Sequence, residues 1–359
     1  MAVAQLQKLP EPFRSFYARR AARELLALAS PACQADTVEV QSNESNNGPT
    51  ALLSSGRRMP LVGFGTWQIP AEDAEAAVRT ALNAGVRHID TASAYRNEQS
   101  IGLALNDALS GNRVRRENMW VTGKLWNSDH GPAVEQVRAA CVRSLQALGL
   151  DYFDLYLVHW PISSGKASAT PIETTWQAMQ RLVAEGLVRS IGVANFSPSR
   201  LQALCGAVST TIKPAVNQVE VHPGWRNTQL RQACDALGVH TTAYAPLGSS
   251  SGLLSDGAVG ELAAANDLTP AQVLLRWGLA NGCSVIPKST SPLRIAENAV
   301  ATWPSPEPAA MDWSTLEGIT QTRQVDGAGL LVGKGAAGSG ISNLAELWGE
   351  EDDLCTEAA

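Results

Sequence analysis

Short apolar segments alternate with stretches of helical periodicity along most of this 359-residue chain, and that alternation limits the folds it can adopt. Strands that alternate with helices are typical of parallel sheets, because neighbouring parallel strands need a crossover connection. The segments lie at residues 61–64, 86–89, 119–121, 153–158, 188–193, 214–219, 239–243 and 283–286. We therefore predict an α/β fold with eight parallel strands.

The stretches between the segments carry the signals with which helices begin and end. Residues 71–84 are rich in alanine and precede Gly85, and glycine is a common helix C-cap because it adopts the left-handed conformation without strain. A second helix is predicted over Pro270–Ala280, where Thr269 offers an N-cap and proline stands at the first helical position.

Two folds accommodate eight such units. A (β/α)8 TIM barrel takes about 250 residues, which this chain can supply. A doubly wound open sheet usually carries G-x-G-x-x-G after its first strand. Gly63 and Gly65 supply only the first two of those glycines, and Pro70 follows. We predict a barrel domain over residues 51–359, with an N-terminal β-hairpin near residues 51–57 and a C-terminal substrate loop.

Polar or aromatic side chains stand at the ends of most of the predicted strands. The carboxyl ends of barrel strands meet on one face, where active sites are found. A single aspartate there is more often a helix cap, and a single histidine is more often a core residue. The combination favours a site on one rim, formed by Asp90, Lys124, His159, Asn195, Gln218, Tyr244 and Lys288.

Several motifs around these residues resemble those of the aldo-keto reductase family. They are residues 85–92 with Tyr95, Asn97 and Glu98, residues 123–126, residues 154–161, and residues 286–289 with Arg294, Glu297 and Asn298. The motifs occur in the family order, and residues 275–279 with 284–290 resemble the plant members most. The resemblance implies NADPH-dependent reduction of aldehydes or ketones, of sugar-type or aromatic structure, to alcohols.

The resemblance also assigns catalytic roles to four residues. Reduction of a carbonyl needs a hydride at carbon, which the cofactor supplies, and a proton at oxygen, which the protein supplies. Tyr95 is the expected proton donor, Lys124 lies beside it and is held by Asp90, and His159 orients the substrate oxygen. A free phenol has a pKa near 10, so we expect the Lys124 ammonium to lower the pKa of Tyr95.

The resemblance further implies the residues that bind NADPH. Asn195 and Gln218 are expected at the nicotinamide carboxamide, with Tyr244 on the ring face. The family usually has serine where Ala194 stands, so one hydrogen bond, worth about 0.5–1.5 kcal/mol, is expected to be missing. Arg294 beside two hydroxyls suits a ribose phosphate and favours NADPH over NADH. The implied set is Thr66, Trp67, Asn195, Gln218, Tyr244, Leu247, Lys288, Ser289, Thr290, Arg294, Glu297 and Asn298.

Three tryptophans, Trp67, Trp126 and Trp160, follow the first, third and fourth predicted strands and are expected to bind the substrate. Few charges stand near them, which favours an apolar or sugar-like carbonyl over an acidic one. Trp225 and residues 325–333 are expected to add walls, and the glycine-rich tail after Gly327 is expected to form a mobile loop over the pocket.

Two other functions stay open on the sequence alone. A nucleotide-binding regulatory subunit on the same fold would turn over little and retain its cofactor tightly. A metal-dependent barrel hydrolase would need several histidines or carboxylates on one rim, and His88, His130, His222 and His240 are not grouped in that way. We therefore predict no metal.

Composition disfavours several classes of partner. The net charge is −6 and no lysine or arginine run occurs, which disfavours nucleic acid. No apolar run approaches the roughly 20 residues that span a bilayer. None of the six cysteines lies in a C-x-x-C pair, which disfavours a zinc site or a disulfide framework. We predict a monomer that acts on a small-molecule carbonyl compound, without nucleic-acid or membrane partners.

Residues 1–50 differ from the rest of the chain and are predicted to be an N-terminal extension, either targeting or disordered. Apolar residues near one helical face and several arginines are typical of organelle-targeting peptides, whereas Glu11 and Glu24 are not. We predict a cytoplasmic protein, with chloroplast or mitochondrion as the alternative.

Overall fold

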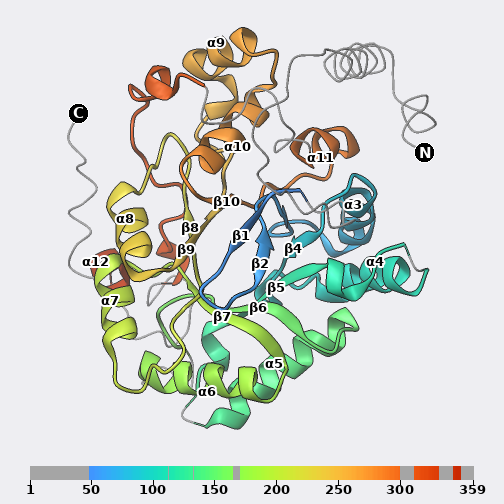
Figure 1. Cartoon of the computed structure of the whole chain (residues 1–359), viewed down its shortest axis with the longest axis vertical. Helices are drawn as coiled ribbons and strands as arrows, with labels where there is room; N and C mark the ends of the chain where they lie inside the picture. The colour runs from blue at the N-terminus through green and yellow to red at the C-terminus, as the bar shows by residue number, and fades with distance from the viewer. Residues whose placement is uncertain are drawn as a thin grey trace, which may run out of the picture. The chain divides into compact units, whose positions relative to one another are not determined.

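The computed structural model describes residues 48–111, 113–131, 133–164, 170–299, 311–330 and 343–348. Eight parallel strands form one sheet in chain order, and Figure 1 shows helices outside it. The strands are β3 (Phe64–Gly65), β4 (His88–Asp90), β5 (Trp120–Leu125), β6 (Phe153–Val158), β7 (Val188–Ala194), β8 (Val216–Glu220), β9 (His240–Tyr244) and β10 (Ser284–Val285).

The last strand lies beside the first, so the sheet closes into a barrel. Val285 N donates to Leu61 O at 2.8 Å, Gly63 N donates to Val285 O at 2.9 Å, and Gly65 N donates to Pro287 O at 3.0 Å. Closure removes the unpaired edges that an open sheet would present. The predicted (β/α)8 fold is confirmed, and it brings the strand ends to one rim.

The first and third strands differ most in extent from the predicted apolar segments. The first is not 61–64: β3 covers Phe64–Gly65, and Val62 pairs with Val285 only through an isolated bridge. The third apolar segment covers only residues 119–121, whereas the strand continues to Leu125, so Lys124 lies near its end as predicted. Polar side chains occupy its inward-facing positions. They interrupt the run of apolar residues in the sequence, but the barrel interior can bury them.

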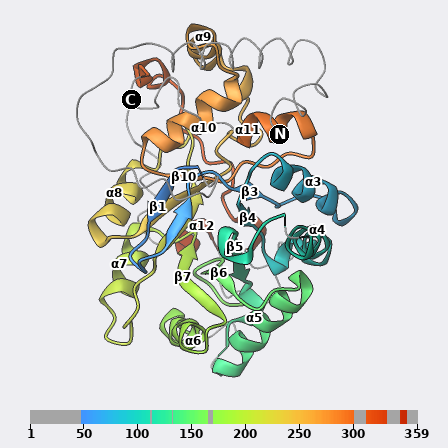
Figure 2. The ribbon, with the colours of Figure 1, turned by 45° about the vertical axis from the view of Figure 1, so that its right-hand side comes forward.

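Helices connect successive strands on the outside of the barrel, as Figures 1 and 2 show. The α-helices are α3 (Ala71–Asn83), α4 (Glu98–Ser110), α5 (Val134–Leu148), α6 (Ile172–Ala184), α7 (Pro198–Gly206), α8 (Thr228–Leu237), α9 (Gly257–Ala265), α10 (Pro270–Ala280), α11 (Pro292–Ala299) and α12 (Leu344–Trp348). Short 3₁₀ helices cover Ser93–Tyr95, Arg116–Asn118, Asn127–Asp129, Leu253–Ser255, Trp313–Leu316 and Ala328–Leu330.

The helix signals of the sequence act as predicted. Gly85 follows α3 with a φ of 94°, a conformation that glycine adopts without strain. Helix α10 begins at Pro270 after a capping box, in which Thr269 Oγ1 accepts from Gln272 N and Gln272 Oε1 accepts from Thr269 N. These local interactions fix where each helix begins or ends beside its strand.

A β-hairpin closes the barrel end at which the strands begin. Its strands β1 (Thr50–Leu52) and β2 (Arg58–Pro60) pair antiparallel, which confirms the predicted hairpin. Leu53 and Met59 are buried there in one cluster with Trp120, Leu155 and Leu157. Because this end is filled by apolar side chains, the site must lie at the other end.

Some predictions fall outside the described residues. They concern residues 1–47 of the N-terminal extension and the glycine-rich tail at residues 331–342. Monomeric state and localisation stay predictions. Among the described residues, no helix is long and apolar enough to cross a membrane. The four described cysteines, Cys141, Cys205, Cys234 and Cys283, are free thiols.

Candidate active site

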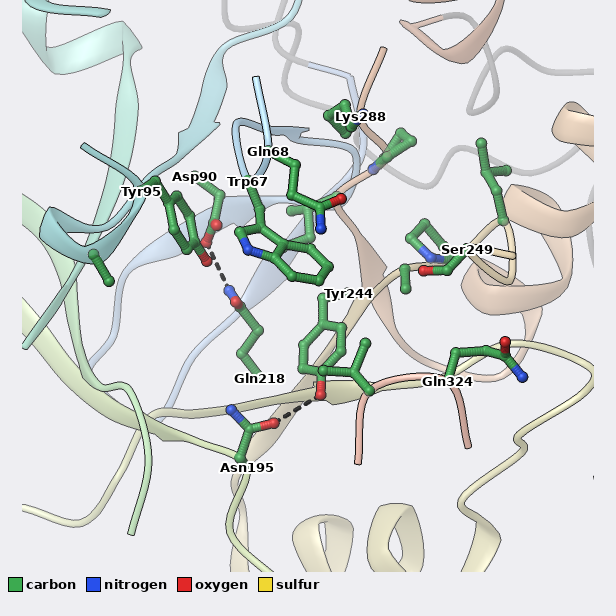
Figure 3. A pocket seen from close by; sticks show the side chains of 18 of the residues that line it. Trp67, Gln68, Asp90, Tyr95, Asn195, Gln218, Tyr244, Ser249, Lys288 and Gln324 are labelled. Atoms are coloured by element: carbon green, nitrogen blue, oxygen red, sulfur yellow. Dashed lines mark hydrogen bonds between the residues drawn. The ribbon is translucent and has the colours of Figure 1, made fainter. Parts of the chain in front are cut away.

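A cavity of about 1510 Å³ opens at the rim where the strands end. It exceeds the roughly 300–1,000 Å³ of an ordinary ligand pocket, so it can hold a dinucleotide together with a substrate. Figure 3 shows Asp90, Tyr95 and Gln218 on one side of it and Ser249 and Gln324 on another. The strand-end residues that line it are Asp90, His159, Asn195, Gln218, Tyr244 and Lys288.

Lys124 lies at the centre of a buried polar network beneath the cavity. Its Nζ donates to Asp90 Oδ1 at 2.5 Å, to Thr91 O at 3.0 Å and to the Tyr95 hydroxyl at 3.1 Å. The three donor positions of the ammonium are thereby all used. Since the Tyr95 oxygen accepts one of these bonds, its own proton is directed elsewhere.

The turn that carries Tyr95 is held from both sides. Tyr95 ends the 3₁₀ helix Ser93–Tyr95, and Arg96 follows with a φ of 59°. Asn97 Nδ2 donates to Thr66 O at 2.9 Å and to Ile69 O at 3.0 Å, which ties the turn to the loop after β3. The sequence around residue 95 therefore fixes the position of the phenol.

Electrostatics keep the tyrosine protonated and the lysine charged. Burial raises the pKa of Tyr95 above its ordinary value, and it outweighs the opposite effect of the Lys124 ammonium. Lys124 acts in the expected direction, but burial was not foreseen and is the larger effect, so the pKa of Tyr95 is raised overall and not lowered. Burial by itself would lower the Lys124 pKa, but attraction to Asp90 and Tyr95 raises it overall.

His159, directly after β6, stands beside the phenol. Its ring is 5.6 Å from that of Tyr95 and 5.1 Å from that of Trp126, both in edge-on geometry. Burial lowers the His159 pKa well below its ordinary value, and the nearby Lys124 lowers it further. A neutral imidazole at this place can orient a substrate oxygen without adding a charge.

The side-chain amides of Gln218 and Asn195, both expected at the nicotinamide carboxamide, differ in which atoms remain free to bind a ligand. Gln218 Nε2 donates to Asp90 Oδ2 at 2.7 Å, so its oxygen is the atom left to accept from a ligand. Asn195 uses both ends, because Nδ2 donates to His159 O at 2.9 Å and Oδ1 accepts from the Tyr244 hydroxyl at 2.8 Å. Dashed lines in Figure 3 mark the bond between Gln218 and Asp90 and the bond between Asn195 and Tyr244.

The far arm of the cavity is lined by Lys288, Ser289, Arg294, Glu297 and Asn298. Asn298 is 6% exposed, and its Oδ1 is buried without a partner among the described residues. A buried acceptor of this kind suits a donor such as the adenine amino group. Lysine, arginine and hydroxyl groups together suit a phosphate on the ribose, so the residues present fit NADPH.

Some predicted site residues do not line the cavity. Thr66 is fully buried, and its Oγ1 donates to Asp90 O at 2.9 Å, so it supports the loop beside the catalytic network. Thr290 is also absent from the lining, and so is Trp225, whose ring instead packs on Arg323. Trp67, Trp126, Trp160 and Leu247 do line it.

The substrate end holds more charge than the sequence predicts. Arg96, Asp129, Arg143 and Asp326 line the cavity near the tryptophans. Arg143 and Asp129 form an ion pair at 2.6 Å, which reduces the field they present. These residues come from turns and from α5. A pattern based on the ends of strands cannot predict that they lie on the rim.

Left-handed backbone gathers around the cavity, in part at residues that the sequence did not reveal. Five non-glycine residues that line it have positive φ: Gln68, Arg96, Asn195, Ala245 and Ser249. Such conformations are costly for side-chain-bearing residues and cluster at functional sites. No local sequence pattern identified Gln68 or Ser249, because the conformation depends on contacts made after folding.

Comparisons with known proteins agree with this geometry. Residues 61–306 match the model of the Aldo/keto reductase family. An aldo-keto reductase of Mycolicibacterium smegmatis is 47% identical over 250 residues, 70% of this chain and 86% of that protein. Aldo-keto reductase family 4 member C11 of Arabidopsis thaliana is 39% identical over 315 residues, 83% and 97%. The crystal structure of Bombyx mori aldo-keto reductase in complex with NADP aligns with a TM-score of 0.66 at 35% identity, covering 70% of this chain and 87% of that one.

Proposed function

The chain belongs to the aldo/keto reductase family and is an NADPH-dependent carbonyl reductase, and from that premise we propose how its own residues act. Tyr95 gives the proton to the carbonyl oxygen as the alcohol forms. Asp90, Lys124 and His159 support that transfer from three sides. The observation that carries the proposal is the bond from Lys124 Nζ to the Tyr95 hydroxyl at 3.1 Å.

The polarity of that bond gives each group its role. The Tyr95 oxygen accepts from Lys124, so its proton is available to a substrate oxygen on the cavity side. When the proton leaves, the phenolate that remains stands beside an ammonium already present. Asp90 keeps that ammonium in place, and a neutral His159 can donate to the same substrate oxygen.

NADPH, when bound, supplies the hydride to the carbonyl carbon. We assign its nicotinamide carboxamide to the free oxygen of Gln218 and its ring face to Tyr244. The buried Asn298 Oδ1 would hold the adenine, and Lys288 and Arg294 the ribose phosphate. With both polar ends of Asn195 already bonded within the protein, that residue acts by fixing Tyr244.

We infer the substrate class from the residues that line the open end of the cavity. Trp67 is 42% exposed and, with Trp126 and Trp160, offers flat faces that stack on aromatic or sugar rings. The charged groups at the same end favour a substrate that carries hydroxyls as well. We propose aromatic and sugar-type aldehydes as the preferred carbonyl compounds.

Tyr95→Phe tests the role of the phenol. Loss of a positioned general acid costs about 10²–10⁴-fold in turnover, whereas NADPH affinity should stay within about twofold because the residue makes no assigned cofactor contact. The measurement is NADPH absorbance over a panel of aldehydes, with cofactor affinity by fluorescence. Full activity in this variant would refute the assignment. Slow turnover of the unmodified protein with every aldehyde would favour a regulatory nucleotide-binding role instead.

A further inference from the structure

Glu220, the last residue of β8, carries a buried carboxylate that the proposed chemistry does not use. It is 2% exposed and lies two positions after Gln218, on the same inward face of the strand. Its oxygens are not free to act on a substrate. Oε1 accepts from His222 Nε2 at 2.9 Å and from Gln324 N at 2.8 Å, and Oε2 accepts from Val325 N at 2.8 Å.

Two of these donors belong to the main chain of a segment about a hundred residues further along. Bonds from backbone N–H groups to a carboxylate are charge-assisted and stronger than neutral ones. If Gln324 and Val325 moved away, a buried carboxylate would lose two of its three donors, which is costly. Glu220 therefore ties residues 324 and 325 of this segment directly to the barrel.

The segment held in this way forms one wall of the cavity. Residues 324–330 line the cavity without a gap in the chain. The Gln324 side chain, labelled in Figure 3, accepts from Ser250 Oγ at 3.2 Å and so meets the loop after β9. The wall therefore borders the substrate end of the cavity and also contacts the loop after β9, which leads toward the part of the cavity proposed to bind the cofactor.

A second set of contacts, made by Trp348, holds the residues next to those bound by Glu220. Trp348 Nε1 donates to Asp326 O at 2.8 Å, and the Trp348 ring packs edge-on against Trp160 at 5.5 Å. The Arg323 guanidinium lies 3.9 Å from the Trp348 ring centre and 4.7 Å from that of Trp225. Glu220 binds residues 324 and 325 and Trp348 binds residue 326, so two anchors hold the first residues of the wall.

We propose that Glu220 is a specificity-determining positioning residue of this reductase. By fixing the main chain at residues 324–325, it sets the width of the substrate end and lets a large carbonyl compound pack against a wall that is already ordered. A small aldehyde that reaches only the catalytic network does not use this wall. The inference rests on the proposed function and deepens it.

Glu220→Gln tests the anchor with little change in size. A glutamine keeps one acceptor but turns the other oxygen into an NH₂ group, which faces a backbone N–H and cannot accept from it. We expect the amides of Gln324 and Val325 to exchange hydrogen at least tenfold faster. For naphthaldehyde we expect KM to rise about tenfold with kcat within about twofold, because one ordered contact surface is lost.

With propanal, and for the affinity of NADPH, the same variant should stay within about twofold of the unmodified protein. Glu317→Gln is the matched control, since Glu317 is an exposed carboxylate of the same C-terminal region. Trp348→Phe loosens the other anchor without touching β8 and should raise the KM for naphthaldehyde in the same direction by a smaller factor. This second variant keeps the test valid if Glu220→Gln folds poorly.

Equal losses for both aldehydes, or unchanged amide exchange at residues 324 and 325, would overturn the role of Glu220. Either result would leave the reductase assignment intact. Failure of the proposed function has another signature, namely no turnover of either aldehyde by the unmodified protein. The two proposals can therefore fail separately.

Discussion

The two ends of the barrel bury polar side chains in different ways. Where the strands begin, neutral groups bond to one another: His88 Nε2 meets Thr122 Oγ1 at 3.0 Å, and His240 Nε2 meets Ser284 Oγ at 3.2 Å. Where the strands end, charged groups pair, with Asp90 and Lys124 at 2.5 Å. On β4 only one residue separates His88 from Asp90. The change from neutral to charged buried groups therefore takes place within a few ångströms along one strand.

This difference corresponds to the different surroundings of the two ends. The hairpin covers the first end, so its polar groups need only satisfy one another and remain neutral. Burial lowers the pKa of both His88 and His240 to about 4. The other end opens on the cavity, and there the buried ammonium of Lys124 stands beside the Tyr95 phenol, as the proposed mechanism requires. We infer that the charge pair of the second end gives up some stability for the proposed chemistry, whereas the polar groups of the first end have no such role.

The strongest way to break this comparison is Lys124→Met. We expect turnover to fall at least about a thousandfold, because the phenol loses its ammonium. Stability should fall by about 3–5 kcal/mol, because Asp90 is left as a buried charge without its cation. NADPH oxidation and urea unfolding measure the two effects.

Lys213→Met is the control for that variant, because Lys213 is exposed. Its stability should change by less than about 0.5 kcal/mol. If Lys124→Met instead unfolded at the same urea concentration as the unmodified protein, the charge pair would not be the costly element that the comparison assumes.

His88→Gln tests the neutral end through pH. The folded-state pKa of His88 is lowered from 6.5 to about 4 by burial. In that window the unfolded chain binds more protons than the folded protein, so stability is complete above pH 6.5 and decreases as the pH falls toward 4. The contribution is at most about 3 kcal/mol.

We expect His88→Gln to flatten this acid dependence while turnover at neutral pH changes less than about threefold. Urea unfolding over a pH series measures the slope, and His240→Gln should act in the same way because its pKa is lowered to about 4 as well. An unchanged acid slope in both variants would mean that other groups control acid stability.

Arg294→Ala has the smallest expected effect and sharpens the comparison on the exposed arm of the rim. We expect about tenfold weaker binding of NADPH and less than about twofold for NADH, since one charge-assisted contact to the ribose phosphate is lost. Fluorescence titration with both cofactors measures the ratio. Arg57→Ala is the control, because Arg57 is an exposed arginine in the hairpin at the opposite end, and it should leave both affinities unchanged. Equal losses of affinity for both cofactors in Arg294→Ala would contradict the phosphate role.

Local sequence was sufficient for the order of elements and for the face on which the catalytic residues lie. The helix signals at Gly85 and Thr269 act over a few residues, so they work before any tertiary contact forms. Strand alternation has a period of two, so residues such as Asp90 and Lys124 must point inward once their strands pair. The barrel and the rim that carries the polar residues followed from these local rules, whereas the proposed roles of those residues came from the family resemblance.

Only the tertiary structure decided which partner each rim residue found. The bond from Gln218 to Asp90 joins residues 128 positions apart, and the bonds from Gln324 and Val325 to Glu220 span more than a hundred. The sign of the Tyr95 pKa shift also depended on burial, which no spacing in the sequence reveals. Period and capping are properties of neighbouring residues, whereas burial and long-range bonds exist only after the sheet has closed.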